Sequence, residues 1–372
     1  MRSFAAMPAR MIVPFHNLQI SLKAIEPEVE AAMHRVLSSG RFILGPELEK
    51  FEREFARYTG ASYCAGVGSG TDAITLSLKA LGIGKGDEVI TSALTAYPTI
   101  TGIAGAGARP VLVDVRQEDG LIDPALVEKL ITSRTKAIVP VHLYGQCCDM
   151  QALIRLARRH SLKIVEDCAQ SAGATCGNRH SGTYGDCGAF SFYPTKNLGA
   201  LGDGGAVITK NAAVYRKVLS LRDYGRVGSR FVEEGVNSRL DEIQAAVLRV
   251  KLKRLERWIQ ERRSLAKTYE DHLSPDFYFA EHQDRRHVYH LFPVRVPRRR
   301  AVIKELKSKG ISIGVHYARP VFEEKAFRWP VRGPFTHATR ICREVLSLPL
   351  FPGRTRHQVL YVIRCLNEAL RR

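Results

Sequence analysis

The chain has 372 residues, of which 45% are hydrophobic and 25% are charged. These proportions exclude a disordered or fibrous protein, and a chain of this length usually contains more than one domain. Lys and Arg outnumber Asp and Glu by 56 to 37, which gives a formal charge of +19. The basic residues are scattered in short groups such as residues 298–300, so a solvated basic surface is the simpler interpretation and a polyanion-binding role is the alternative.

The sequence shows no feature of a secreted or membrane protein. Residues 1–10 (MRSFAAMPAR) lack the apolar stretch of a secretory signal, and no run reaches the roughly 18 apolar residues of a membrane span. The eight cysteines form no CxxC pair and no zinc-type spacing. We therefore expect a cytoplasmic protein with reduced thiols and predict no metal site.

Between residues 60 and 210, short apolar runs alternate with amphipathic stretches. Helices are predicted after Asp123-Pro124 and after Asp149, because both positions carry helix-start signals. Four runs are apolar enough to be strands buried on both faces of a sheet, namely residues 87–91, 109–115, 136–144 and 162–167. This alternation predicts an α/β fold with a mostly parallel mixed sheet sandwiched by helices.

The pattern changes after about residue 240. A long helix is predicted over residues 240–272, followed by a strand, a helix, a strand and a last helix at residues 290–296, 302–309, 311–317 and 356–370. We interpret this part as a smaller α+β domain. The predicted domains are a large α/β domain over residues 1–250, which includes the N-terminal segment, and a small C-terminal domain over residues 251–372.

In an open parallel sheet, ligands bind outside the carboxyl ends of the strands, and a glycine-rich segment lies at such a position. In residues 66–74 (GVGSGTDAI), three glycines lead into a predicted helix, so backbone N–H groups and the helix dipole could hold a phosphate. Gly68, Gly70 and Ala73 also fit a relaxed dinucleotide-binding pattern. A simple turn with a helix cap is the alternative.

Two further positions carry reactive side chains. Asp167, next to Glu166, ends an apolar strand, and two such carboxylates are costly to remove from water unless a cationic group meets one of them. Lys196 lies in a glycine-rich turn that is otherwise short of charge, where partial burial would lower its pKa and make the amine a nucleophile. A capping carboxylate and a solvated lysine are the alternatives.

The order and spacing of these segments resembles one known family. Together with residues 39–56, 140–150, 165–174 and 235–248, they look like the DegT/DnrJ/EryC1/StrS sugar aminotransferases, which belong to the fold-type I pyridoxal-phosphate enzymes. The resemblance extends from about Phe15 to the last helix. It implies pyridoxal 5'-phosphate as the cofactor and the fold-type I architecture.

The resemblance also implies roles for individual residues. Lys196 matches the lysine that binds the cofactor covalently, Asp167 matches the partner of the pyridine nitrogen, and Gln170 matches the residue near the phenolic oxygen. The phosphate cup corresponds to Gly70, Thr71, Asp72 and Ser191. Asn237 matches an asparagine that reaches the phosphate across a subunit interface, which implies a homodimer with shared active sites.

By the same resemblance, the amino group comes from L-glutamate through the pyridoxamine 5'-phosphate form. The acceptor is a nucleotide-linked keto-deoxysugar used in glycan, lipopolysaccharide or antibiotic synthesis. Many members place an aromatic ring where this chain has Ala96. That alanine resembles the branch acting on 3-keto sugars, with 4-keto sugars as the next choice, and so does the trio Tyr193, His316 and Tyr317. Arg239, with Arg41 and Arg226, is a candidate for binding the diphosphate.

Three alternatives remain open at this point. A sugar dehydratase of the same family has histidine where Lys196 stands, and a nicotinamide-dependent oxidoreductase leaves Lys196 unexplained. A nucleic-acid-binding protein would need a clustered basic face, which the sequence does not show. His142 could lie near the cofactor or be a hydrogen-bonded core residue.

Overall fold

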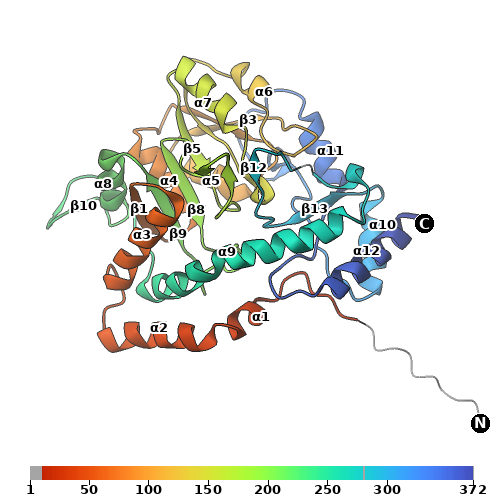
Figure 1. Cartoon of the computed structure of the whole chain (residues 1–372). Helices are drawn as coiled ribbons and strands as arrows, with labels where there is room; N and C mark the ends of the chain where they lie inside the picture. The colour runs from red at the N-terminus through yellow and green to blue at the C-terminus, as the bar shows by residue number, and fades with distance from the viewer. Residues whose placement is uncertain (1–10, 280, 372) are drawn as a thin grey trace, which may run out of the picture.

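A seven-stranded sheet forms the centre of the computed structural model, which describes residues 11–279 and 281–371 (Figure 1). The strand order is β1-β9-β8-β5-β4-β2-β3. Only β9 runs antiparallel to its neighbours, so the predicted mostly parallel sheet is confirmed. The strands are β1 (Tyr63–Val67), β2 (Glu88–Ser92), β3 (Arg109–Val113), β4 (Thr135–Val139), β5 (Lys163–Asp167), β8 (Cys187–Ser191) and β9 (Gly205–Thr209).

Helices cover both faces of this sheet, because successive strand residues point to opposite sides. Ala189 and Val207 belong to one apolar core, whereas their neighbours Phe190 and Ile208 belong to another. The first core includes residues of α4 (Gly70–Ala80), α5 (Tyr97–Gly105) and α8 (Ala212–Leu221). The opposite face packs against α3 (Pro46–Thr59), α6 (Pro124–Glu128), α7 (Met150–Arg159) and α9 (Glu242–Glu270).

The helix α9 runs along the molecule and joins its two parts (Figure 1). Its first turns pack against α2 (Glu26–Ser39) and α3, and its last turns enter a core of C-terminal elements. Those elements are the antiparallel pair β13 (Phe292–Arg295) and β14 (Val345–Leu348), with α10 (Arg299–Ser308) and α12 (Arg356–Arg371). Because α9 passes residue 250 without a break, the division into domains 1–250 and 251–372 stays a prediction.

The remaining elements are short. They comprise α1 (Leu18–Lys23), α11 (Thr336–Glu344), a small sheet of β6 (Thr175–Cys176), β7 (Arg179–His180) and β12 (Arg285–Arg286), and a hairpin of β10 (Arg226–Val227) and β11 (Arg230–Phe231). Single 3-10 turns occur at Leu143–Gly145, Pro275–Phe277 and Val321–Glu323.

Most of the predicted elements are confirmed within a few residues, but the strand predicted over residues 311–317 is wrong. Ile311 pairs with Val13 of the N-terminal segment, whereas Gly314 pairs with Ser347 of β14. The start and the middle of this stretch therefore have different backbone partners, and no continuous ladder forms. The helix after Asp123 is confirmed but ends early, at Glu128.

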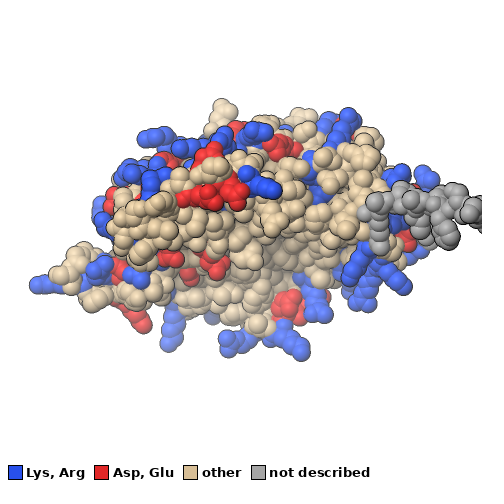
Figure 2. Space-filling view, turned by 90° about the horizontal axis from the view of Figure 1, so that it is seen from below, with Lys and Arg blue, Asp and Glu red and all other residues tan. Residues whose placement is uncertain are grey.

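The surface agrees with the scattered charge of the sequence. On the face shown in Figure 2, Lys and Arg side chains lie mainly around the margin, next to acidic ones, and the centre is largely uncharged. All eight cysteines are buried and unpaired in disulfides, as expected for reduced thiols. Within residues 11–279 and 281–371, no helix has both the length and the apolar character that crossing a bilayer requires. The prediction made for residues 1–10 lies outside the described residues.

Candidate active site

A cavity of about 310 Å³ opens at the carboxyl ends of the central strands, where ligands bind in open α/β sheets. It collects most of the predicted cofactor residues from segments far apart in the chain: Gly70, Thr71, Asp167, Gln170, Ser191 and Lys196, with the predicted substrate residue Tyr193. Ala96 lines it as well. Four other polar residues line the cavity and were not predicted individually from the sequence: Ser69, Thr95, Thr99 and Asp203.

Lys196 and Asp167 face the same cavity. Burial lowers the pKa of Lys196 to about 8, and the Asp167 carboxylate acts in the opposite direction. A substantial fraction of the amine is therefore neutral near pH 8 and able to act as a nucleophile. Burial raises the pKa of Asp167, against hydrogen bonds and the positive charge of Lys196. A cationic group placed beside this carboxylate would keep it ionised.

A short relay of hydroxyl groups orients Asp167. The Thr99 hydroxyl donates to Asp167 Oδ2 at 2.8 Å, and the backbone N–H of Ala169 donates to Oδ1 at 3.1 Å. Thr95 Oγ1 lies 2.7 Å from Thr99 Oγ1, and both threonines are buried. Since the Thr99 proton points at Asp167, the Thr95 hydroxyl donates to Thr99. The carboxylate is thus held on one side and presented to the cavity on the other.

The glycine-rich segment forms a narrow cradle at the start of α4. Ser69 caps the helix by accepting the Asp72 N–H at 3.1 Å. A Cβ atom at Gly70 would lie 2.6 Å from the Cβ of Ser191, so only glycine fits there. A helix N-terminus with close, unobstructed backbone N–H groups suits a phosphate, and the donor set therefore fits the phosphate of the expected cofactor.

Gln170 links the cavity to the C-terminal part of the chain. Its side-chain oxygen accepts the Tyr144 N–H at 2.7 Å, and its Nε2 donates to the Tyr317 hydroxyl at 3.0 Å. His316, the neighbour of Tyr317, makes a 2.9 Å hydrogen bond to Ser347 and stacks on Phe15. Burial lowers the pKa of His316 to about 4, and the positive charge of Lys196 acts in the same direction. His316 and Tyr317 are therefore grouped near the cavity, although neither lines it.

Three further predicted residues, Asp72, Asn237 and Arg239, do not line the cavity either. Asp72 instead accepts a 2.9 Å hydrogen bond from Ser238, whose hydroxyl oxygen accepts the Gly68 N–H. Arg239 pairs with Asp223 at 3.0 Å. Asn237 is exposed, and its predicted role across a subunit interface stays a prediction. Of the other arginines considered, Arg226 is also paired with Asp223, and Arg41 donates to the Leu44 carbonyl.

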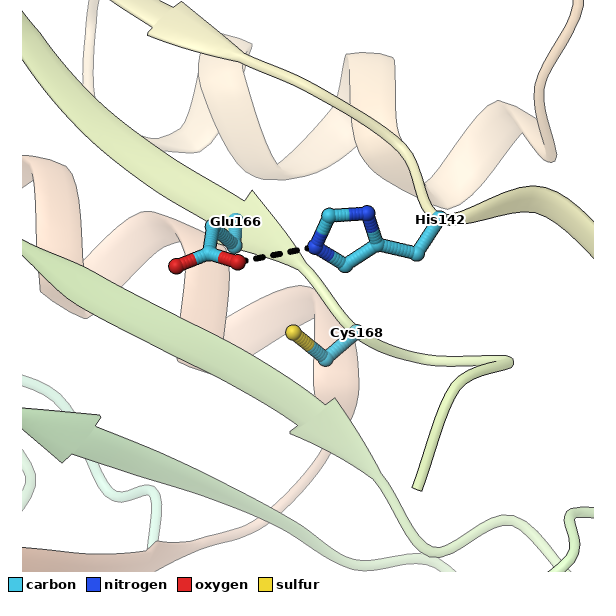
Figure 3. A group of neighbouring side chains, drawn as sticks. All are labelled: His142, Glu166 and Cys168. Carbon is cyan, nitrogen blue, oxygen red and sulfur yellow. Dashed lines mark hydrogen bonds and ion pairs between the residues drawn. The ribbon is translucent and has the colours of Figure 1, made fainter. Parts of the chain in front are cut away.

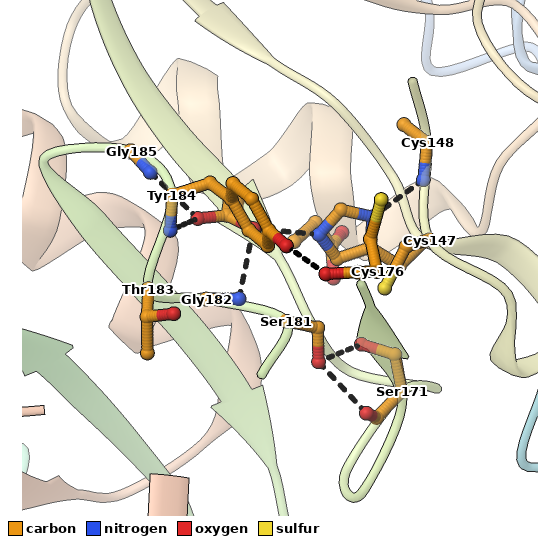
Figure 4. Close-up of polar contacts among 12 residues, drawn as sticks. Cys147, Cys148, Ser171, Cys176, Ser181, Gly182, Thr183, Tyr184 and Gly185 are labelled. Atoms are coloured by element: carbon orange, nitrogen blue, oxygen red, sulfur yellow. Dashed lines mark hydrogen bonds and ion pairs between the residues drawn. The ribbon is translucent and has the colours of Figure 1, made fainter. Parts of the chain in front are cut away.

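The second carboxylate of β5 points away from the cavity. Glu166 accepts from His142 Nε2 at 2.9 Å, as Figure 3 shows, and from three backbone N–H groups of the 182–185 turn. Figure 4 labels the residues of this turn, and the Cys148 N–H donates to His142 Nδ1 at 3.0 Å. Because that N–H can only donate, the His142 ring carries its proton on Nε2. His142 is therefore a satisfied core residue, which decides between the two interpretations left open by the sequence.

Comparison with known proteins identifies the family. The family model described as the DegT/DnrJ/EryC1/StrS aminotransferase family matches residues 23–367. The chain belongs to this family. A dTDP-3-amino-3,4,6-trideoxy-alpha-D-glucose transaminase of Micromonospora megalomicea subsp. nigra is 45% identical over 350 residues, covering 91% of this chain and 94% of that protein. The predicted enzyme class, an aminotransferase, is thereby confirmed.

Solved structures agree with this assignment. DesV from S. venezuelae, solved in complex with a ketimine intermediate, superposes with a TM-score of 0.94 at 44% identity and covers 97% of this chain and 99% of that chain. NtdA from Bacillus subtilis, solved with bound cofactor PMP, has a TM-score of 0.90 at 30% identity, with 99% and 87% coverage. The predicted fold class is confirmed.

Proposed function

We propose that this aminotransferase uses pyridoxal 5'-phosphate to transfer an amino group from L-glutamate to the 3-keto position of a nucleotide-linked deoxysugar. The observation that carries the proposal is that Lys196, Asp167 and the glycine cradle at α4 line one cavity. Pyridoxal phosphate is the cofactor, and its three recognition elements, a phosphate, an aldehyde and a ring nitrogen, match these three features. The related transaminase, whose name specifies a 3-amino sugar, supports the 3-keto position.

The roles of the residues follow from their positions. The backbone N–H groups at Gly70 and Thr71 and the side chain of Ser191 hold the phosphate. Asp167, oriented by Thr99, stays ionised against the protonated ring nitrogen. When bound, the cofactor carries the amino group and takes up the electrons released when a substrate C–H bond breaks.

Lys196 acts twice. Its neutral amine first attaches the cofactor, which the lowered pKa of about 8 favours. When not attached to the cofactor, the same amine would be free in the cavity to take up a proton as a general base and return it as a general acid. Lys196 also argues against a sugar dehydratase, because a dehydratase of this family is expected to have histidine at this position.

The sugar end of the site is assigned to Tyr193, His316 and Tyr317. Tyr193 is 53% exposed at the cavity, which leaves its ring free to contact a sugar. The small side chain of Ala96 leaves space on the cavity wall where a larger residue would restrict the acceptor. Arg239 remains a candidate for the diphosphate, reachable if its pair with Asp223 opens or if it serves a second subunit.

A homodimer with shared active sites completes the proposal. Asn237 is exposed, and exposed apolar side chains lie on the segments next to it, at Val236 and at Phe42, whose carbonyl accepts the Glu242 N–H. Exposed apolar side chains of this kind would be covered by a second subunit. Asn237 is proposed to reach the cofactor phosphate of the partner subunit.

Borohydride trapping tests the proposal. The purified protein is expected to be yellow, to lose its colour with L-glutamate, and, after borohydride reduction, to carry the cofactor on the peptide that contains Lys196. The pyridoxamine form is then mixed with 3-keto and 4-keto dTDP-deoxysugars, and recovery of the yellow colour identifies the acceptor. A colourless protein that binds no cofactor on reconstitution contradicts the function, and selective reaction with the 4-keto sugar contradicts the ring position.

A further inference from the structure

A second cavity lies beside Lys196, and its walls are positively charged. Its volume is about 190 Å³, and Lys196 lines both this cavity and the first one. The N-terminal segment contributes His16 and Asn17, and α9 contributes Lys251 and Arg262. No acidic residue lines it among residues 11–279 and 281–371.

The two basic side chains of α9 are buried there with donors to spare. Lys251 is 7% exposed, and its ammonium donates one hydrogen bond, to the Gly199 carbonyl. Arg262 is 5% exposed and donates through Nη1 alone, while its Nε and Nη2 bond to no described residue. The acceptors of Nη1 are the carbonyls of Tyr289, His290 and Leu350. Burial lowers the pKa of Arg262 to about 10, because the charged guanidinium is removed from water.

The surroundings add to the positive potential. Burial, together with Arg262, His316, Arg354 and Lys196, lowers the pKa of His16 to about 4. Arg354 is itself buried, and its Nε and Nη1 have no hydrogen-bond partner in the described part of the chain. Burying several cations without a counter-charge is costly, so the arrangement is best explained by an anion that enters during function.

We propose that this second cavity binds the side-chain carboxylate of a dicarboxylic amino donor while the donor's amino group faces Lys196. The inference rests on the proposed aminotransferase function and names where its donor is recognised. The contacts are ammonium and guanidinium groups of Lys251 and Arg262, which form charge-assisted hydrogen bonds with a carboxylate.

The volume of the second cavity favours the amino donor, rather than the sugar acceptor, as its ligand. The acceptor carries its charge on a diphosphate joined to a nucleoside and a sugar, and a cavity of about 190 Å³ is smaller than the pockets that enclose ligands of that size. A carboxymethyl group, by contrast, fits. Lys196 borders both cavities, so a donor seated in the second one reaches the reacting end of the first.

The Lys251→Met variant tests the proposal in the donor half-reaction. We expect the KM for L-glutamate to rise by about 10- to 100-fold, because one charge-assisted hydrogen bond is lost, with little change for L-glutamine, whose side-chain amide is neutral. The preference for glutamate over glutamine therefore falls. Lys251→Arg should restore it, and Lys253→Met, at an exposed position on the same helix, is the matched control.

Other outcomes overturn the inference. Equal losses with both donors would mean that Lys251 only supports Gly199 and the lysine turn, and a loss confined to the keto-sugar half-reaction would mean a phosphate site. Borohydride trapping at Lys196 shows separately whether each variant still holds its cofactor; failure of that step in the unmodified protein would refute the proposed function instead.

A measurement on the unmodified enzyme does not depend on any variant folding. Glutarate, which has two carboxylates and no amine, should inhibit the donor half-reaction competitively, and its monoamide should bind more weakly by about tenfold or more. Equal inhibition by the two compounds would contradict a carboxylate site.

Discussion

Glu166 and Asp167 are consecutive residues of β5, both carboxylates and both buried, yet their surroundings differ in one respect. Glu166 is saturated: each of its oxygens accepts two hydrogen bonds, from His142 and from the turn at residues 182–185. Asp167 accepts one hydrogen bond on each oxygen, from Thr99 and from Ala169, and its remaining capacity faces a cavity.

This difference separates a structural carboxylate from a functional one. A buried acid whose acceptor positions are all filled stabilises the fold and has nothing left for a ligand. A buried acid with acceptor capacity directed into a cavity bears a desolvation cost that a ligand's positive charge relieves. Burial alone does not distinguish the two, but the count of hydrogen bonds does.

The largest effect expected from this comparison is on Asp167. Replacing Asp167 by Asn removes the negative charge but keeps the size, and amine transfer should slow by about 100-fold or more, since a preorganised charge at the reacting group is lost. The rate is measured from the cofactor absorbance after mixing with L-glutamate. Borohydride trapping at Lys196 should persist in this variant, and an unchanged rate would disprove the assignment of the ring-nitrogen partner.

Glu166→Gln should lower the stability of the protein and leave its activity unchanged, the opposite of what is expected for Asp167→Asn. An amide NH2 placed at either oxygen position would face two hydrogen-bond donors, so the free energy of unfolding should fall by about 3 kcal/mol. Urea denaturation measures this loss. The rate constant per correctly folded molecule should stay unchanged, and a variant of normal stability that is inactive would reverse the roles given to the two acids.

Thr99→Val sharpens the comparison with a smaller effect. The valine removes the hydroxyl that orients Asp167 while keeping the branched shape, so the rate constant of the donor half-reaction should fall by about three- to tenfold, the value of one net hydrogen bond. Thr99→Ser, which retains the hydroxyl, serves as the control. A normal rate in both variants would show that Asp167 needs no such support.

Several parts of this site could be predicted from the sequence because they depend on local pattern. Asp167 ends an apolar run and Lys196 interrupts a charge-poor one, and both features are visible without a structure. The glycine cradle is equally local, since the glycines stand directly before the α4 helix. Family resemblance then supplied the roles that pattern alone left open.

Other parts depend on which distant segments meet. The sequence does not reveal that Thr99 turns toward Asp167 or that Glu166 turns away from the cavity, because both facts require the fold around β5. The alternation at residues 311–317 suggested a strand, but tertiary partners divided it. The role proposed for Asn237, toward a second chain, likewise has no local signal in the sequence and came only from the family resemblance.

The continuity of helix α9 fixes the relative positions of residues in two parts of the molecule. Its 29 residues place Glu242, which accepts the backbone N–H groups of Gly45, Glu47 and Leu48, on the same rigid rod as Lys251 and Arg262. Deleting a single residue between them would rotate everything downstream by about 100°. The number of residues between Glu242 and Arg262 therefore fixes their relative orientation. Insertions and deletions should be absent from this part of α9 in related sequences, whereas surface loops are free to vary in length.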